Sequence, residues 1–436
     1  MELLYKIITN LVIIFFKMIY REKYIESIKK WLWKDKIIVL KWARQVWKTT
    51  LLKYFEEYLN KNWKKTFFVF CDNLDNTFLK SPKYFIEYLK LKFDFENLDE
   101  KIYIFLDEFQ YIKDSWLFLK NIFDKYKDKL QLIVSGSSSL EITKNTEFLT
   151  WRTITFYIDR LSFEEFFHFK TNILKKLNID NFEELQNFYE IMKKDLEISF
   201  LEYLNYGWYP EVVLTKSDDE KKKIIKEIVK TYIEKDIALF MRIENIWIFN
   251  DFIKVLSSNI WELLNINELS NILNISIKTL NKYIDILEWT FVFSRIRPFF
   301  RNVRKELSKM PKIFIEDLSI KNYVLWDFNW VYNKIDIWQD VENFVYNELR
   351  KKIEKERIYF YRTISKSEID FILERKYWFY DLLEVKYRKK VIIPSQFKKF
   401  EEKYGVWKKI IITKDICKKE NNIFFIPACI FWLITL

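Results

Sequence analysis

Residues 36–50 read KIIVLKWARQVWKTT, a short β-branched run that enters a loop and then a helical pattern, TTLLKYFEEYLNKN at 49–62. From Trp42 to Thr49 the residues match the spacing G-x-x-x-x-G-K-[ST] at its lysine and hydroxyl positions. Trp42 and Trp47 stand where that spacing requires glycine. The order of strand, loop and helix predicts an α/β fold with this loop between its first strand and the following helix.

The loop predicts a binding site for the phosphates of a nucleotide. Backbone N–H groups and the helix N-terminus would hold the β- and γ-phosphates, Lys48 would reach their oxygens, and the Thr49 hydroxyl would face Mg²⁺. The nucleotide-binding residues predicted in this way are Trp42, Ala43, Arg44, Gln45, Val46, Trp47, Lys48, Thr49 and Thr50. An indole at position 42 or 47 would fill the space that the phosphates need, so the chain as written should not bind ATP.

Composition offers an explanation for the missing glycines. The 436 residues include 3 glycines and 17 tryptophans, whereas average usage of about 7% would give roughly 30 glycines. Other tryptophans also stand where turn chemistry favours glycine, namely Trp63, Trp116, Trp208 and Trp407. We hypothesise that the source organism decodes UGA as glycine and that these codons were translated as tryptophan. UGG codons at 42 and 47 would contradict this, and the alternative is a tryptophan-rich chain with an inactive loop.

Further strands of the same fold carry polar residues at their ends. They are predicted at 66–75, 101–110 and 130–142. The second, KIYIFLDEFQ, ends in Asp107, which would organise the Mg²⁺ shell, and Glu108, which would polarise the attacking water. The third ends near Ser135, which is either a polar sensor of the γ-phosphate or part of a Ser/Gly-rich turn. The predicted catalytic set is therefore Lys48, Asp107, Glu108 and Ser135.

These stretches resemble prokaryotic AAA-type ATPases fused to a C-terminal domain of unknown function with endonuclease-like motifs. The resemblance is carried by WARQVWKTTLL, IFLDEFQ, VSGSSSLE, LTWRTITFYIDRLSFEEF, YLNYGWYPEVV and YIEKDIA, and with the tail it covers nearly the whole chain. It implies ATP and Mg²⁺ as cofactors, and glycine at positions 42, 47, 151 and 208. It also implies that Arg152 senses or completes a nucleotide site, with a structural ion pair as the alternative.

The middle of the chain has mainly helical periodicity. Residues 161–245 are strongly charged and resemble the helical lid and connector of that family. The stretch INELSNILNISIKTLNKYIDILE at 266–288 predicts two helices around a turn at Asn274, within a winged-helix-like domain at 246–305. The residues expected to face DNA are Lys278, Asn281 and Lys282. Winged helices also contact proteins, so both kinds of partner stay open.

An arginine-rich stretch, FVFSRIRPFFRNVRKEL, follows these two helices. Its members are Arg295, Arg297, Arg301 and Arg304. They form either a basic wing that contacts DNA or a set of partners for local acids, and the sequence leaves both readings open.

The C-terminal third has the order helix, three strands, helix, strand, which predicts a restriction-endonuclease-like fold. Asp370 closes one strand, and Glu384 and Lys386 lie on the next, a hairpin's length further on. Asp370 and Glu384 would bind Mg²⁺, Lys386 would orient the attacking water, and Glu342 from the preceding helix would add a ligand. The alternative is a degenerate nuclease fold that is kept as a scaffold.

Composition excludes several other chemistries. The cysteines at 71, 417 and 429 are too far apart for a zinc motif or a disulfide framework, and they fit a reduced cytoplasm. His168 is the only histidine, which excludes most histidine-based catalysis, and we expect it to pack in a helix. The net charge of +12 supports nucleic-acid binding only weakly, because it partly follows from lysine-rich codon usage.

The predicted domains are an ATPase at 18–160, a helical lid at 161–245, a winged helix at 246–305 and an endonuclease-like domain at 306–436. Residues 1–17 are a misassigned start or an additional helix, and their apolar run is too short to span a bilayer. The expected protein is a cytoplasmic, Mg²⁺-dependent ATPase that binds ATP and acts with DNA. The alternative is a nucleotide-dependent switch that binds a protein partner, and the sequence does not decide whether it forms oligomers.

Overall fold

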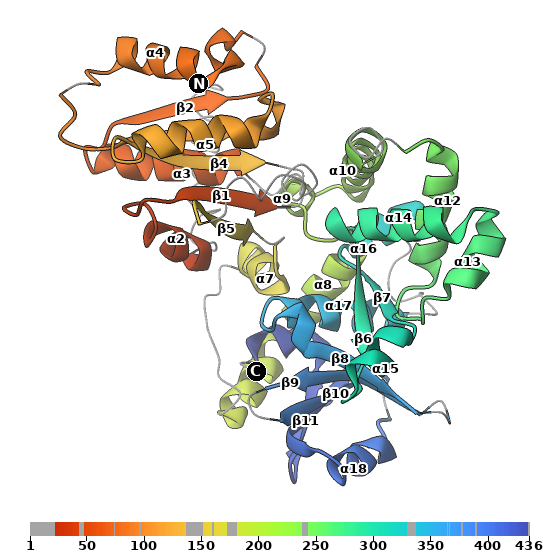
Figure 1. Cartoon of the computed structure of the whole chain (residues 1–436). Coiled ribbons are helices and arrows are strands. Elements are labelled where there is room, and N and C mark those ends of the chain that lie inside the picture. The colour runs from red at the N-terminus through yellow and green to blue at the C-terminus, as the bar shows by residue number, and fades with distance from the viewer. Residues whose placement is uncertain are drawn as a thin grey trace. The chain divides into compact units, whose positions relative to one another are not determined.

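The computed structural model describes most of the chain, as two units at 1–160 and 161–436 (Figure 1). The described residues are 22–42, 48–73, 75–95, 97–136, 151–158, 161–171, 181–237, 243–328, 337–363, 365, 367–375, 378–388 and 390–434. The N-terminal segment 1–17 and the loop residues Ala43, Arg44, Gln45, Val46 and Trp47 lie outside them. Trp42 and Lys48 are placed in a strand and a helix, with no description of their side chains.

The first unit is built on a parallel sheet with the strand order β2-β3-β4-β1-β5. The strands are β1 (Ile37–Trp42), β2 (Thr66–Phe70), β3 (Ile102–Asp107), β4 (Leu130–Gly136) and β5 (Thr153–Ile158). The helices are α2 (Glu22–Lys29), α3 (Lys48–Lys61), η1 (Thr77–Lys80), α4 (Pro82–Lys92), η2 (Phe109–Tyr111) and α5 (Ser115–Tyr126). β3 and β4 are buried along their whole length, as expected for a parallel sheet that is covered on both faces. The carboxyl ends of β1, β3 and β4 therefore meet at one edge of the sheet.

The strand β5 is absent from the strands that the sequence predicted. It lies at the edge of the sheet, and only Ile158 of its residues is buried. A half-exposed edge strand lacks the continuous apolar run that marks the central strands, so its pairing with β1 was not evident from the sequence.

The second unit contains an eight-stranded mixed sheet with the order β12-β13-β11-β10-β9-β8-β6-β7. Its strands are β6 (Phe293–Pro298), β7 (Lys312–Ile315), β8 (Ile358–Arg362), β9 (Glu368–Glu374), β10 (Phe379–Lys386), β11 (Gly405–Thr413), β12 (Lys418–Glu420) and β13 (Ile423–Pro427). β9 is antiparallel to β8 and β10, and β10 is parallel to β11. Antiparallel pairing puts Asp370 on β9 beside the end of β10 that carries Glu384.

Helices precede, separate and follow these strands along the chain, and Figure 1 labels most of them. They are α7 (Phe163–Thr171), α8 (Phe182–Tyr206), α9 (Pro210–Leu214), α10 (Asp218–Lys230), the π-helix η4 (Thr231–Ile237), α12 (Ile246–Ser258), α13 (Ile266–Leu273), α14 (Ile277–Trp289), α15 (Val303–Ser308), α16 (Leu318–Val324), α17 (Ile337–Arg350), η6 (Lys355–Arg357), α18 (Ser395–Glu401) and η7 (Ala428–Leu433). The succession α17, β8, β9, β10, α18, β11 is the order of elements that the C-terminal sequence predicted.

The sheet is continuous across the border that the sequence placed between 305 and 306. β6 pairs with β7 in antiparallel fashion and with β8 in parallel fashion. Lys312 on β7 also forms a bridge with Leu263, which precedes α13. The predicted border therefore falls inside the connection between two paired strands, and backbone hydrogen bonds join the two predicted domains into one body.

The helical segment expected as a lid of the ATPase contributes to the core of the second unit. Phe163 on α7 meets Phe344 of α17 edge to face, with ring centroids 5.8 Å apart. Tyr203 on α8 meets the same ring at 5.8 Å. His168 is buried in α7 with its ring 5.7 Å from that of Trp432, so it occupies the packing position that the sequence predicted.

Several tryptophans adopt the left-handed backbone conformation that favours glycine. Those with positive φ are Trp63, Trp151, Trp261, Trp326 and Trp378. Trp63 is 94% exposed and Trp151 is 88% exposed, so their rings gain little from packing. Trp116 and Trp208 behave differently from the expectation, because both are buried and Trp116 lies inside α5 against Phe109. Trp407 also departs from the expectation, because it lies within β11 and has no positive φ. Trp116 and Trp407 therefore do not occupy turns.

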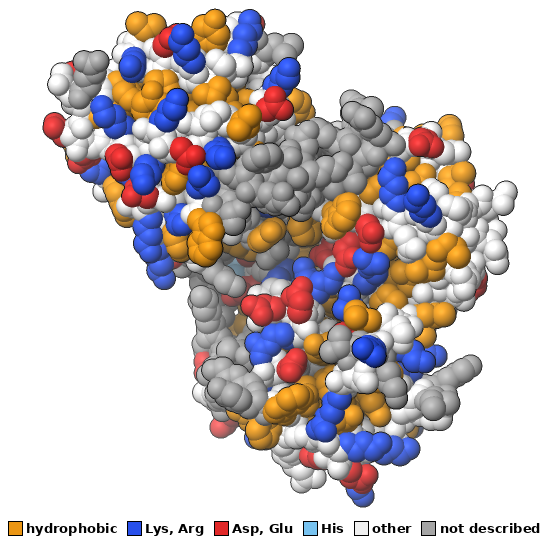
Figure 2. Space-filling model, in the orientation of Figure 1, with side chains coloured by type: hydrophobic (Ala, Val, Ile, Leu, Met, Phe, Trp, Pro, Cys, Tyr) orange, Lys and Arg blue, Asp and Glu red, His pale blue; other side chains and the backbone are white. Residues whose placement is uncertain are grey.

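The surface carries charges of both signs. On the face in Figure 2, lysine and arginine side chains are spread among acidic ones and do not gather into one basic patch. In the part of the chain that the structure describes, every helix is too short or too polar to cross a membrane.

Candidate functional site

The first candidate site lies where β1, β3 and β4 end, next to the N-terminus of α3. The Thr49 hydroxyl, in the first turn of α3, donates to Asp107 Oδ2 at 2.6 Å. The Ser135 hydroxyl on β4 donates to the other carboxylate oxygen, Oδ1. Asp107 is buried at the end of β3, so these two hydroxyls hold both oxygens of one enclosed carboxylate. Three residues from different parts of the sequence are brought together, as the motif predicted.

Glu108 follows directly and turns the chain out of the strand. Its backbone is left-handed, with φ 54° and ψ 45°, and its N–H donates to Ser135 Oγ at 3.2 Å. Its carboxylate accepts a hydrogen bond from the Gln110 side chain, a contact that the sequence did not predict. A Cβ at Gly136 would lie 2.9 Å from Gln110 Oε1, so glycine is required behind this residue. Gln110 therefore orients the carboxylate of Glu108, the group that we expect to polarise the attacking water.

Two other groups near this edge have altered acidities. Burial, reinforced by the negative charge of Asp107, raises the pKa of the Cys71 thiol and keeps it protonated. Burial also lowers the pKa of Lys41, the last residue but one of β1, to about 8. The sequence motifs did not point to Cys71 or Lys41, because the pKa shift of each residue results from its burial in the folded structure.

Arg152 lies at the other edge of this sheet. Its carbonyl oxygen accepts from the N–H of Ile37, the first residue of β1, at 2.7 Å. Its guanidinium donates to Asp124 of α5, with Nε 2.6 Å from Oδ1. Because β1 runs from Ile37 toward the loop, Arg152 is separated from Thr49 and Asp107 by the length of the strand. Its contacts are those of a structural ion pair within the unit.

The second candidate site is a group of four acidic side chains, which we call the carboxylate cluster: Glu342, Glu368, Asp370 and Glu384. They line a cavity of about 580 Å³ together with Lys312, Lys386, Trp261 and Trp338. The N–H of Val385 donates to Asp370 Oδ2 at 2.7 Å, and the N–H of Asp370 donates to Glu384 Oε2 at 3.2 Å. Lys386 Nζ lies 2.5 Å from Glu384 Oε1. The hairpin thus brings Asp370, Glu384 and Lys386 together.

The cluster concentrates negative charge in a buried place. Burial, followed by repulsion from Asp370, raises the pKa of Glu384 to about 8. Burial likewise raises the pKa of Glu342 to about 8, and it raises the pKa of Asp370. A bound cation would favour the ionised form of these carboxyl groups, because opposite charge lowers their pKa. Carboxylate oxygens are also ligands that suit Mg²⁺.

Glu342 has a partner that the sequence did not reveal. Lys312 Nζ lies 3.1 Å from Glu342 Oε1 and also contacts Glu368. Burial alone would lower the pKa of Lys312, but these two carboxylates hold it above its ordinary value. Within the described ranges, no three acidic, histidine or cysteine side chains already gather as a set able to hold a metal ion. The structure therefore pairs Glu342 with an ammonium group instead of placing it as a third ligand.

The two helices predicted at 266–288 are formed by α13 and α14. Asn274 joins them in the left-handed conformation, with φ 51° and ψ 47°, and Ser276 caps α14 by accepting from the Thr279 N–H at 3.1 Å. Lys278 and Lys282 are exposed on α14, and Asn281 is half-buried between them. The side chains proposed to face DNA thus share one helix and include two that are open to solvent.

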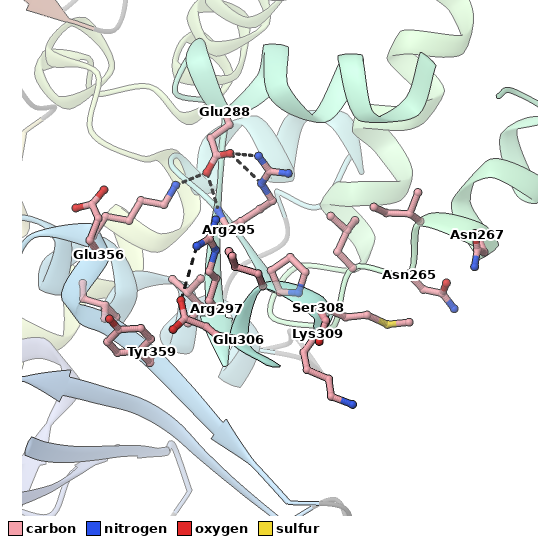
Figure 3. A pocket seen from close by; sticks show the side chains of 18 of the residues that line it. Asn265, Asn267, Glu288, Arg295, Arg297, Glu306, Ser308, Lys309, Glu356 and Tyr359 are labelled. Atoms are coloured by element: carbon pink, nitrogen blue, oxygen red, sulfur yellow. Dashed lines mark hydrogen bonds and ion pairs between the residues drawn. The ribbon is translucent and has the colours of Figure 1, made fainter. Parts of the chain in front are cut away.

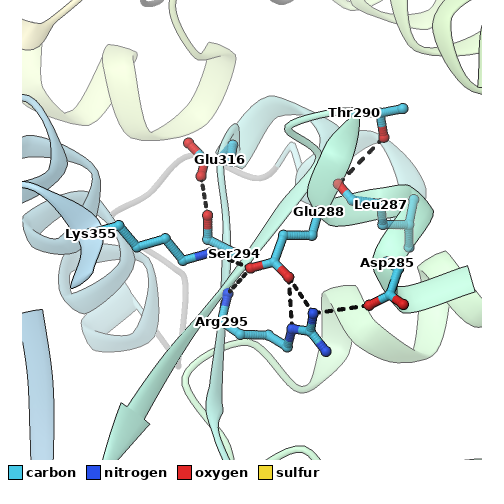
Figure 4. Close-up of polar contacts among 8 residues, drawn as sticks. All are labelled: Asp285, Leu287, Glu288, Thr290, Ser294, Arg295, Glu316 and Lys355. Atoms are coloured by element: carbon cyan, nitrogen blue, oxygen red, sulfur yellow. Dashed lines mark hydrogen bonds and ion pairs between the residues drawn. The ribbon is translucent and has the colours of Figure 1, made fainter. Parts of the chain in front are cut away.

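A groove with a cavity of about 930 Å³ lies beside α14 and the connection from β6 to β7 (Figure 3). At one end Glu288 accepts from Arg295 and from Lys355, and Arg295 also reaches Asp285 at 3.0 Å (Figure 4). Although burial opposes it, these cations hold the pKa of Glu288 below its ordinary value. Arg295 thus balances local acids.

The other arginines of this stretch differ in their surroundings. Arg297 lies 3.7 Å from Glu306 and so also has an acidic partner. The Arg301 guanidinium stacks over the Tyr404 ring at 5.0 Å, and Arg304 is exposed. Balancing of acids therefore accounts for Arg295 and Arg297, while Arg301 and Arg304 lie nearer to solvent.

The parallel sheet, the loop position between β1 and α3, and the Asp-Glu pair at the end of β3 give the first unit an α/β fold of the P-loop, AAA type. Residues 34–167 match the family model described as an AAA domain. Residues 197–329 match a domain of unknown function, DUF8612, and residues 340–431 match another, DUF4143. The C-terminal region is an α/β domain without a described activity.

Relatives of similar length also match. An uncharacterized protein of Haemophilus influenzae is 25% identical over 71% of this chain and 74% of its own length. An uncharacterized protein of Methanocaldococcus jannaschii is 26% identical over 93% of this chain and 85% of its own. Among solved structures, the ADP form of the Aeropyrum pernix ORC2 protein is 11% identical, with 72% of this chain and 93% of that chain covered and a TM-score of 0.33. AMPPCP-bound DnaA of Aquifex aeolicus is 13% identical, with 62% and 88% covered and a TM-score of 0.26.

Proposed function

We propose that the protein is a Mg²⁺-dependent ATPase that acts on DNA through its second unit. The observation that carries the ATPase part is the enclosed carboxylate of Asp107, held by the hydroxyls of Thr49 and Ser135. Bound Mg²⁺ would neutralise charge that develops on the phosphates. Thr49 and Asp107 would hold it, Lys48 would bind phosphate oxygens, and Glu108 would orient the attacking water.

This activity requires glycine at positions 42 and 47, and we propose that the native chain has glycine at both. Five tryptophans hold a positive φ, as noted above, and each side chain in that conformation costs roughly 1–2 kcal/mol relative to the right-handed one. Glycine in place of these five tryptophans would remove the cost, which supports the same replacement at 42 and 47. A tandem mass spectrum of the peptide from Ala43 to Lys48, taken from the native source, decides between a glycine and a tryptophan residue mass at 47.

The ATPase proposal is tested with two versions of the full chain, one with glycine and one with tryptophan at 42 and 47. Only the glycine version should bind and hydrolyse ATP. Glu108→Gln in that version should keep ATP binding and lower the hydrolysis rate by about 10²-fold or more, because general-base assistance contributes that much. Hydrolysis by the tryptophan version at the same rate would refute the requirement for glycine.

For the second unit we propose phosphodiester cleavage at the carboxylate cluster. Asp370, which is half-buried, and Glu384, which is buried, supply carboxylate oxygens that suit a hard divalent cation. Lys386 lies within hydrogen-bond distance of Glu384 and is 26% exposed, so its ammonium is able to orient a water molecule or a phosphate oxygen. Lys278, Asn281 and Lys282 on α14 would contact the duplex.

The cleavage proposal is tested by Mg²⁺-dependent nicking of supercoiled plasmid by the full chain. Asp370→Ala should abolish nicking, whereas Glu374→Gln, a change on the same strand outside the cluster, should leave it intact. If the version with glycine at 42 and 47 binds ATP and never nicks DNA, the second unit is a scaffold. The protein would then be a nucleotide-dependent switch for a protein partner, which is the rival function.

A further inference from the structure

We propose that Lys312 is a built-in cation of the carboxylate cluster, which holds Glu342 and Glu368 so that Asp370 and Glu384 take one divalent cation instead of two. This deepens the cleavage proposal for the same site and rests on it for its biological meaning. The inference itself concerns charge and ion number, so it is measured without any cleavage.

The position of Lys312 is set by backbone pairing on both sides. It begins β7, where it pairs with Ile296 of β6 and with Leu263 of the segment before α13. Its side chain is 2% exposed and runs over the ring of Phe360, with Nζ 5.6 Å from the centroid. Although Lys312 lines the cavity, its side chain is almost fully buried, so its charge must be answered mainly by groups of the protein.

The charge is answered by two members of the cluster. Nζ lies 3.1 Å from Glu342 Oε1 and contacts Glu368, which Arg362 also approaches at 3.4 Å. Direct contacts divide the cluster into two pairs, while the charge of Lys312 also acts on Asp370 and opposes the rise of its pKa. Glu342 and Glu368 belong to Lys312, while Asp370 and Glu384 are linked to each other by backbone hydrogen bonds and to Lys386.

The two lysines differ in how easily a metal ion could displace them. Lys386 is 26% exposed and sits on the strand that lines the cavity, so it is able to move when a cation arrives. Lys312 is enclosed, so a second cation would have to share the oxygens of Glu342 and Glu368 with a fixed positive charge. Because two positive charges repel strongly at short range in a buried site, a second cation beside Lys312 is disfavoured. A single ion at Asp370 and Glu384 is the arrangement that the charges favour.

This assigns part of the site to a segment outside the nuclease-like order of elements. Lys312 comes from β7, the strand that pairs with β6, and Trp261, from the connection between α12 and α13, also lines the cavity. The cluster is therefore completed by residues that precede α17.

The experiment counts Mn²⁺ ions bound to the nucleotide-free full chain by electron paramagnetic resonance, with Asp370→Asn as the reference that lacks the site. The wild-type chain should bind one Mn²⁺ more than this reference. Lys312→Gln should bind two more, because Glu342 and Glu368 become available to a second ion. Lys312→Arg keeps the charge and should stay at one.

The matched control is Lys321→Gln. Lys321 on α16 forms another buried ion pair, with Asp340, which lies on α17 as Glu342 does. The substitution therefore removes a comparable buried ion pair outside the cluster. It should stay at one ion if Lys312 acts through the cluster, and a second ion in this control would overturn the assignment to Lys312.

Two further results overturn the proposal: two Asp370-dependent ions in the wild-type chain, or an unchanged count of one in a folded Lys312→Gln chain. The wild-type count decides the matter even if Lys312→Gln does not fold. One ion in the wild type and two in the variant, together with no plasmid nicking, would support the inference and refute the cleavage proposal, so the two fail separately.

Discussion

At the scale of single residues, Trp63 and Trp151 hold backbone φ angles of 59° and 71° with their rings in solvent. A Cβ is penalised in this conformation and glycine is not. The sequence located Trp63 through the scarcity of glycine at turns, and the family resemblance located Trp151. It did not separate them from Trp116, whose helical backbone and buried ring became known only when its neighbours were placed.

This difference predicts opposite effects of the same substitution. Trp63→Gly should raise the free energy of unfolding by about 1 kcal/mol, because it removes left-handed strain. Trp116→Gly should lower it by about 3 kcal/mol or more, because it leaves a cavity in a packed core. Denaturant unfolding of the full chain, followed by fluorescence, measures both. Destabilisation by Trp63→Gly would argue that this indole belongs in the native protein.

Lys41 gives a residue-scale prediction for pH. Its folded-state pKa is about 8 and its ordinary value is 10.5, so the unfolded chain binds more protons between these two values. Stability should therefore rise with pH across that window, because the cost of burying the charge is relieved. Lys41→Met should stabilise the first unit most below pH 8, by on the order of 1–2 kcal/mol, and progressively less toward pH 10.5. A stabilisation that is independent of pH across this window would show that the pKa of Lys41 is not lowered in the folded state.

At the scale of elements, the central strands and the two helices at 266–288 were predictable, because apolar runs and turn residues are local signals. Asn274 is the clearest case, since the sequence placed a left-handed residue there and the structure gives it φ 51°. The edge strand β5 was not predictable, because its pairing with β1 is a property of the sheet and not of its own sequence.

The turn at Asn274 predicts a graded response. Asn274→Ala should lower the free energy of unfolding by about 1 kcal/mol, since alanine tolerates the left-handed conformation poorly. Asn274→Gly should be close to neutral, because glycine adopts that conformation readily. Thermal melts of the two variants, read against wild type, measure the difference. Equal melting temperatures for alanine and glycine would mean that the turn relaxes to another conformation.

At the scale of the whole molecule, the helix-turn-helix segment, the groove and the carboxylate cluster belong to one unit. Backbone pairing of β6 with both β7 and β8 joins segments that the sequence had assigned to separate domains. The expected lid at 161–245 likewise packs into this unit, because its aromatic residues complete the core around Phe344.

If the second unit binds DNA through α14, affinity should fall steeply with salt. Lys282→Ala should weaken binding to any sequence and reduce the slope of log affinity against log salt by about one phosphate contact, or roughly 0.9. Lys222→Ala, an exposed lysine on α10, should leave the slope unchanged. Fluorescence anisotropy with the full chain at several salt concentrations provides the slopes. Identical slopes for wild type and Lys282→Ala would exclude α14 as the contact.

The sequence by itself determined the α/β class, the place of a loop between the first strand and α3, the Asp107–Glu108 pair after β3, and the hairpin that pairs Asp370 with Glu384. These follow from local patterns, because periodicity and motif spacing act over a few residues. Only the tertiary structure decided that Gln110 holds Glu108, that Arg152 lies at the far edge of its sheet, and that Lys312 neutralises Glu342. Such contacts join residues far apart in the chain, and burial and charge select them only after the sheets have formed.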